Sequence, residues 1–156
     1  MAGAWRRIGV MVATGCTLVG ATACANPVGV DPAPSASEPV CAELLLELPD
    51  ELGGQERRST TSQASRAWGD PAIVLRCGVT PLGPTVEGCV TVASGDGTEV
   101  DWVVIEHEDH GSFTTYGRLP AVEVRIPSEY AGDQTIMTEL SAVVADLPRD
   151  GDRACL

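Results

Sequence analysis

The stretch RAWGDPAIVLRCGV, residues 66–79, combines a turn, a short apolar run and a cysteine. Its turn, Gly69-Asp70-Pro71, places a residue before proline, and such a residue is biased away from helix. We therefore predict that the chain is extended here and that residues 72–77 form a strand. Because residues 73–75 are apolar at consecutive positions, both faces of this strand need cover, which is typical of a central strand.

Four more strands are predicted downstream, separated by turn-forming residues. The segment TPLGP (80–84), with two prolines, and the hairpin-turn segment SGDGT (94–98) bound one of these strands. The last segment, AVEVRI, alternates apolar and charged residues, as a half-buried strand does. The complete set of predicted strands is 72–77, 86–93, 99–106, 112–117 and 121–126.

Two amphipathic helices are predicted on either side of the strands. The first has apolar residues at i, i+3, i+4 and i+7 within residues 41–48 and ends before Pro49. The second begins after Asp133, a suitable N-cap, and its apolar face extends over residues 136–147. Both helices thus have one face that must pack against another element.

The polar residues 50–68 between the first helix and the central strand show no clear periodicity. We predict an irregular segment here, with at most a short helix over 62–67, although 19 residues is long for a loop in a compact domain. The predicted fold class is therefore α+β: a mostly antiparallel five-stranded sheet with an N-terminal and a C-terminal helix packed on one face.

Residues 1–23 have the parts of a secretory signal peptide: two arginines near the start, an uncharged apolar body and small residues at the end. The apolar body is about 16 residues, below the roughly 20 that a spanning helix needs, and a retained signal anchor is the alternative. Residues 24–39 contain four prolines and are predicted to form a tether or a disordered end. One globular domain, residues 40–156, follows.

The segment Ala21-Thr22-Ala23-Cys24 can be interpreted in two ways. Ordinary signal peptidase would cut it after a small residue, or it resembles the bacterial lipobox, in which the cysteine receives the lipid. Cys16, which follows another run of small residues, is a second candidate. We predict lipidation at Cys24 and a position at the outer face of the cytoplasmic membrane, with free secretion as the alternative.

The charge of the chain excludes one class of partner. There is no lysine, and 10 basic residues stand against 22 acidic ones, for a net charge of −12. Removal of the leader takes away two arginines and leaves a net charge of −14. A domain this acidic repels phosphate backbones, so we predict no nucleic-acid partner.

The domain contains four cysteines: Cys41, Cys77, Cys89 and Cys155. An even number of cysteines in an exported chain indicates disulfide bonds, and the absence of a C-x-x-C pair argues against zinc or thioredoxin-like chemistry. Three pairings are possible. We favour Cys77 with Cys89, across a rigid proline-containing loop, and Cys41 with Cys155, which join the two ends of the domain.

Several motifs together resemble a known family. They are CAELLLELPDELGGQERR, RAWGDPAIVLRCGV, VDW, FTTYGR and VEVRIP, which occur in this order between residues 41 and 127. The sequence resembles the actinobacterial family 3515 of domains of unknown function. The resemblance implies exported, often lipid-anchored envelope proteins without an assigned activity, and it transfers no catalytic residue.

No motif predicts catalysis. The segment EHEDH, residues 106–110, is the only histidine cluster and could hold a divalent metal, but it is interpreted as a solvated turn, so we predict no metal and no cofactor. There is no G-x-S-x-G motif, and disulfide-bonded cysteines cannot act as nucleophiles. We predict a non-catalytic accessory or binding module; the alternative is a small envelope hydrolase or metal-dependent enzyme.

A possible binding surface is predicted around the turn of the organising stretch, with an unknown envelope protein or a small anionic ligand as partner. An exposed tryptophan beside arginine is a pair in which binding energy concentrates, and arginine holds anions in bidentate geometry. In the alternative interpretation the tryptophan fills the core and the arginines neutralise local acids. The predicted surface consists of Arg66, Trp68, Gly69, Asp70 and Arg118.

Overall fold

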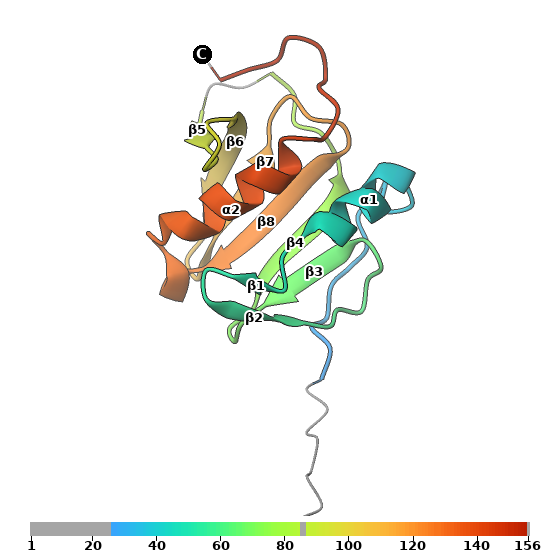
Figure 1. Ribbon diagram of the computed structural model, residues 1–156, viewed down its shortest axis with the longest axis vertical. Coiled ribbons are helices and arrows are strands. Elements are labelled where there is room, and N and C mark those ends of the chain that lie inside the picture. Colours follow the sequence, from blue (N-terminus) through green and yellow to red (C-terminus); the bar gives the residue numbers. More distant parts are fainter. Residues whose placement is uncertain (1–25, 85–86, 156) are drawn as a thin grey trace, which may run out of the picture.

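The computed structural model describes residues 26–84 and 87–155, which contain one antiparallel sheet and two helices (Figure 1). The order of strands in the sheet is β1-β2-β3-β4-β8-β7-β6-β5. In chain order the elements are α1 (Pro39–Glu47), β1 (Glu51–Leu52), β2 (Gln55–Arg58), β3 (Ser65–Trp68), β4 (Ile73–Val79), β5 (Cys89–Ala93), β6 (Glu99–Glu106), β7 (His110–Thr115), β8 (Ala121–Pro127), the 3-10 helix η1 (Ser128–Tyr130) and α2 (Gln134–Val144).

The prediction of a five-stranded α+β fold is wrong, because the sheet has eight strands and the fold is mostly β. The additional strands β1, β2 and β3 lie in the polar stretch 50–68, which was expected to be irregular. Gly53 and Gly54 adopt φ values of 53° and 74°, which L-residues rarely adopt, and form the two-residue turn between β1 and β2. Residues 65–67, the last part of the segment considered for a short helix (62–67), belong instead to β3, which pairs with β4.

The two helices pack on the same side of the sheet and share one core with it (Figure 1). Alternate residues of β4 and β8 point to this side, so each strand contributes one apolar face. Burying a large apolar side chain of this kind stabilises the fold by roughly 1.5–3 kcal/mol. The largest fully buried side chains include Trp68, Ile73, Leu75, Trp102, Val122, Val124, Ile136 and Leu140.

The four domain cysteines form two disulfide bonds, which confirms the predicted disulfides, but the predicted pairing is wrong. Cys41 of α1 bonds Cys77 of β4, and Cys89 of β5 bonds Cys155 near the C-terminus. The sheet order explains the error, because β8, β7 and β6 lie between β4 and β5. At about 4.8 Å per strand, Cys77 and Cys89 lie on strands roughly 19 Å apart, beyond the reach of a disulfide.

Residues 26–38, which were expected to form part of the tether, lie along the domain. The Val28 amide donates to the Ser59 carbonyl (2.8 Å), and the Thr61 amide donates to the Val28 carbonyl (3.0 Å). Further along, the Ser35 backbone crosses β4 so closely at Gly78, with φ 90°, that any Cβ there would overlap the Ser35 carbonyl group. The predicted signal peptide and Cys24 lie outside the described residues. Within the part of the chain that is described, no helix is long and apolar enough to cross a membrane.

Candidate functional site

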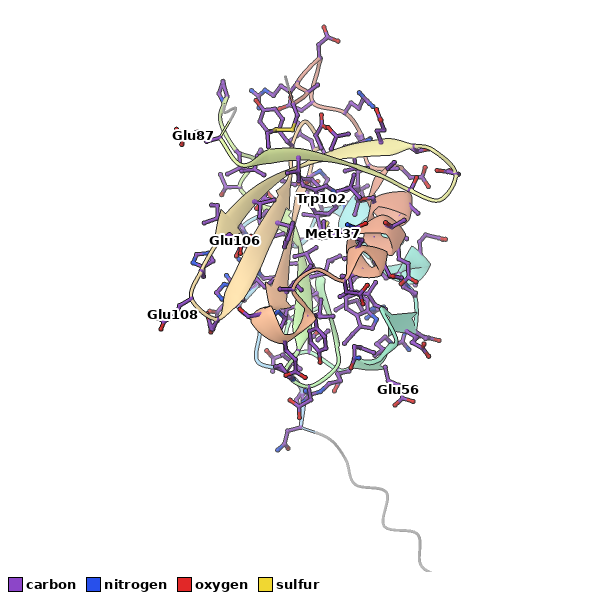
Figure 2. The ribbon with its side chains drawn as sticks, turned by 90° about the vertical axis from the view of Figure 1, so that its left-hand side faces the viewer. Glu56, Glu87, Trp102, Glu106, Glu108 and Met137 are labelled. Carbon is purple, nitrogen blue, oxygen red and sulfur yellow. A yellow bond between two sulfur atoms is a disulfide. The ribbon has the colours of Figure 1, made fainter. Side chains whose placement is uncertain are left out.

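An open cleft of about 520 Å³ lies between the first half of α2 and the end of the sheet formed by β5, β6 and β7. Figure 2 views this side of the molecule, with Glu106 of β6 on one side of the cleft and Met137 of α2 on the other. The segment Ser128–Asp133, which includes η1 and the residues that lead into α2, closes one end. The cleft exists because α2 begins only at Gln134 and leaves this end of the sheet face uncovered.

The floor of the cleft is apolar. It consists of Val92 from β5, Phe113 from β7, Ile126 from β8 and Met137 from α2. Ile126 and Met137 are nearly buried, whereas Val92 and Phe113 are half-buried and reach the cleft surface. A concave apolar floor of this kind favours the burial of an apolar group of a ligand.

The rim of the cleft is polar, and its charged side chains are acidic. Glu106 stands at the end of β6, and Asp133 is the N-cap of α2, where its side chain accepts a hydrogen bond from the Thr135 amide (2.9 Å). Thr91, Ser128, Tyr130 and Thr138 add hydroxyl groups. Among the described residues that line the cleft, none is an arginine or a histidine. The rim therefore favours neutral or cationic ligands over anionic ones.

The polar side chains of the described cleft lining are mainly carboxylates and hydroxyl groups. Asp133 is engaged as a helix cap, and the described cleft lining contains no histidine or cysteine that could act as base or nucleophile. The arrangement of nucleophile, base and orienting group that acyl transfer requires is thus not formed by the residues that line it.

Trp68 does not form an exposed binding surface, so that expectation is wrong. The side chain is fully buried, and its Nε1–H donates to the Pro49 carbonyl (3.0 Å). Gly69 is half-buried and accepts a hydrogen bond at its carbonyl from Arg58 (3.0 Å), while the Asp70 side chain is exposed. The turn thus closes one end of the core.

Arg118 is also buried, and backbone carbonyls rather than an anion accept hydrogen bonds from its guanidinium. Its Nη1 donates to the carbonyls of Ala145 (2.7 Å), the C-cap of α2, and of Leu147 (2.8 Å), two residues further along. These carbonyls form the negative end of the helix dipole, which a guanidinium stabilises. Burial lowers the pKa of Arg118, and the neighbouring Arg149 lowers it further.

Arg66 has a similar structural role at α1. Its Nη2 donates to the Leu45 carbonyl near the end of that helix (3.0 Å). Burial lowers the pKa of Arg66, with a second contribution from Arg57. The structure therefore does not bring Arg66, Trp68 and Arg118 together on one surface.

The histidine segment forms the turn between β6 and β7. The rings of His107 and His110 stack with centroids 4.4 Å apart, so their faces rather than their nitrogens approach each other. His110 Nδ1 lies 2.7 Å from the Asp109 carboxylate, and this hydrogen bond lowers the pKa of Asp109. Among the described residues, no group of three or more potential ligands assembles around one point.

The cleft residues were not predicted as site residues from the sequence. Phe113 lies in the predicted strand 112–117 and Met137 in the predicted C-terminal helix, and neither was singled out as a site residue. The available signal was the run Val90-Thr91-Val92, which combines high β-propensity with side chains that are exposed or half-buried. Only the position of α2 shows that this strand borders a cleft.

Among protein families, the model of the family described as "Protein of unknown function (DUF3515)" matches residues 7–151. This match confirms the resemblance that the motifs between residues 41 and 127 indicated, and it extends the similarity on both sides. No curated protein and no solved structure matches the chain significantly.

Proposed function

The chain belongs to this family, DUF3515, and because the function of the family is unknown, we propose a function from the geometry of the cleft. The protein is an exported binding module that holds a ligand in the cleft between α2 and the β5–β7 end of the sheet, without chemical change of the ligand. The observation that carries this proposal is the preformed cleft of about 520 Å³, with an apolar floor and a polar rim.

The two disulfide bonds support an exported location, because disulfides persist in oxidising compartments. Lipidation of Cys24 would hold the domain near the membrane. Val28 already pairs with residues 59–61, so Cys24 is only four residue steps along the chain from the first backbone hydrogen bond of the domain. Four residues span at most about 14 Å. The loop between β2 and β3 would then face the membrane.

The acidic rim decides between ligand classes. A small anionic ligand was one expectation from the sequence, but Glu106 and Asp133 would repel it, and the arginines of the predicted surface are engaged elsewhere. A neutral or cationic ligand with an apolar part fits both floor and rim. A partner protein of the cell envelope therefore agrees better with the cleft than a free anion.

Photo-crosslinking in producing cells tests the proposed function. A benzoyl-phenylalanine at Thr138, on the α2 side of the cleft, should give one discrete crosslinked species. The matched control places benzoyl-phenylalanine at Glu56 on β2, whose side chain points into solvent away from the cleft (Figure 2). This control should not give the crosslinked species. Equal crosslinking from both positions, or none from Thr138, would refute a ligand in the cleft.

The anchor is tested separately by the variant Cys24→Ser. The unmodified protein should incorporate a fatty-acid label and remain with the membrane fraction, whereas the variant should incorporate none. Equal labelling of both proteins, or no label in the unmodified one, contradicts lipidation at Cys24 and leaves the cleft proposal unaffected.

A further inference from the structure

We propose that the ligand is an extended polypeptide segment with alternating apolar and basic side chains, which adds to the free edge of β5 as one more strand. This inference rests on the proposed function and names the class of ligand that the cleft accepts. It is carried by two independent features: the hydrogen-bonding groups of β5 that have no partner among the described residues, and the acidic charge on both sides of that strand.

The hydrogen bonds between β5 and β6 show which backbone groups are free. Antiparallel pairs alternate between hydrogen-bonded and non-hydrogen-bonded positions. The Val104 amide donates to the Gly88 carbonyl, and the Ser94 amide donates to the Thr98 carbonyl, both at 2.8 Å. Gly88 and Ser94 are therefore at hydrogen-bonded positions, and in the register of β5 and β6 the even-numbered residues between them, Val90 and Val92, are hydrogen-bonded to β6 as well. The N–H and C=O groups of Thr91 and Ala93 therefore point away from β6.

Both of these residues line the cleft, and in the described residues β5 is the last strand of the sheet. An incoming strand would thus find its hydrogen-bonding partners at the wall of the cleft. Recognition by strand addition uses such an edge for affinity and the adjacent pockets for specificity. Side chains on one side of the added strand would point toward the apolar floor.

The β5 edge lacks the features that protect other sheet edges from pairing. Its sequence, CVTVA, contains neither a charge nor a proline, and its side chains are mostly exposed. The opposite edge, β1, has only two residues and begins with Glu51. Short edge strands and charges prevent unwanted strand pairing, so the contrast indicates that β5 is kept open for a partner.

The edge strand is also held rigidly, which reduces the entropy lost on binding. Cys89, its first residue, is bonded to Cys155. Asp101 of the neighbouring β6 accepts hydrogen bonds from the Thr91 hydroxyl (2.6 Å) and from the Cys155 amide (2.8 Å). The strand and the C-terminal segment are thereby fixed to each other.

The charges around β5 specify basic side chains. Glu106 and Asp133 line the cleft on one side of the sheet. On the other side, Asp101 and Glu99 stand opposite Thr91 and Ala93 in the register. Successive side chains of the added strand point to opposite faces of the sheet. Those on one face would contact the apolar floor, and those on the other would point toward the face of Glu99 and Asp101, where basic side chains are favoured. The ligand is therefore expected to alternate apolar and basic residues.

A second copy of the chain is the competing occupant, since β5 could pair with β5 of another molecule. Without its leader each molecule carries a net charge of −14, and β5–β5 pairing would bring two such acidic domains edge to edge, with the Glu99 and Asp101 positions of the two β6 strands three strand spacings, about 14 Å, apart. Like charges so placed oppose association. The separate partner is therefore favoured.

Selection from a random octapeptide library with the full exported protein, disulfides intact, tests this inference. We expect enriched peptides with basic residues at alternate positions and affinities that fall as salt is raised. Acidic or non-alternating consensus peptides, no enrichment, or a β5-dependent dimer in sedimentation velocity would overturn the proposal.

Backbone methylation of a selected peptide tests the strand pairing without a change in the protein. N-methylation at the residues whose N–H faces β5 should weaken binding about tenfold, and methylation at the intervening residues should not, since one hydrogen bond is lost only in the first set. On the protein, Ala93→Pro removes an outward N–H, and Ala93→Val is the matched control that keeps it. Equal effects of both methylation sets would overturn strand addition.

The two proposals fail in different ways. If peptides or cell proteins crosslink from Thr138 but the two methylation sets are equivalent, the cleft binds a ligand and only strand addition is wrong. If Thr138 gives no crosslink with the selected peptide either, the cleft is not the binding site and both proposals are wrong.

Discussion

The hydrogen bond between Trp102 and Ser141 holds α2, one wall of the cleft, on the sheet, and its removal should measurably loosen that wall. Trp102 Nε1–H donates to Ser141 Oγ (3.0 Å), and both residues are fully buried. The variant Ser141→Ala leaves the indole N–H buried without a partner, at a cost of about 1–3 kcal/mol. Alanine is the better helix former by about 0.5 kcal/mol, which opposes this loss. We therefore expect the free energy of unfolding to fall by about 1–2.5 kcal/mol.

Equilibrium unfolding in urea with intact disulfides measures this change. The matched control is Ala142→Ser at the next, exposed residue of α2, which reports the helix propensity alone and should cost about 0.5 kcal/mol. In a Trp102→Phe background the donor is absent, so Ser141→Ala should cost almost nothing. An equal cost of Ser141→Ala in both backgrounds would show that the hydrogen bond does not hold α2, and the reasoning would be refuted.

Three further changes test other parts of the structure. Trp68→Ala should destabilise the protein by roughly 3–5 kcal/mol in the same urea assay, because it empties a buried site; a loss below 1 kcal/mol would contradict its burial. Cys89→Ser with Cys155→Ser opens a loop of 66 residues and should cost about 4 kcal/mol on the chain-entropy model, with faster amide exchange in β5; unchanged exchange there would show that the bridge does not fix the edge. Hydrogen bonds from the Ser94 hydroxyl and the Thr98 amide lower the pKa of Asp96, so its contribution to stability is complete above about pH 4 and is lost as the pH falls through the lowered pKa; Asp96→Asn should abolish that part of the acid dependence, which NMR-monitored titration of unfolding checks.

The sequence predicted the part of the fold that is encoded by apolar periodicity. The strands from Glu99 to Ile126 and both helices lie close to their expected positions, because alternation and the i, i+3, i+4 spacing report directly on a buried face. The strands β1 to β3 were missed for the opposite reason. QERR of β2 has no apolar residue, and its place in the sheet is set by backbone pairing and by the Gly53-Gly54 turn.

The cleft could not be predicted from local patterns, since its residues come from four distant segments of the chain. Val92, Phe113 and Met137 each satisfy the expected pattern of their own strand or helix. What makes them a site is that α2 covers only part of the sheet face, a property of the tertiary packing. The disulfide pairing was missed for the same reason, because the strand order separates Cys77 from Cys89, and the packing of α1 on the sheet places Cys41 beside Cys77.

Amide hydrogen exchange of β5, measured with and without a selected basic octapeptide, tests whether a peptide ligand pairs with the β5 edge of the cleft. In the free protein the amides of Thr91 and Ala93, which point away from β6, should exchange rapidly, while that of Val92 should be protected by its bond to β6. Binding should protect Thr91 and Ala93 and leave the opposite edge strand, β1, unchanged. Protection elsewhere with no change at Thr91 and Ala93 would contradict a ligand that binds at the β5 edge of the cleft.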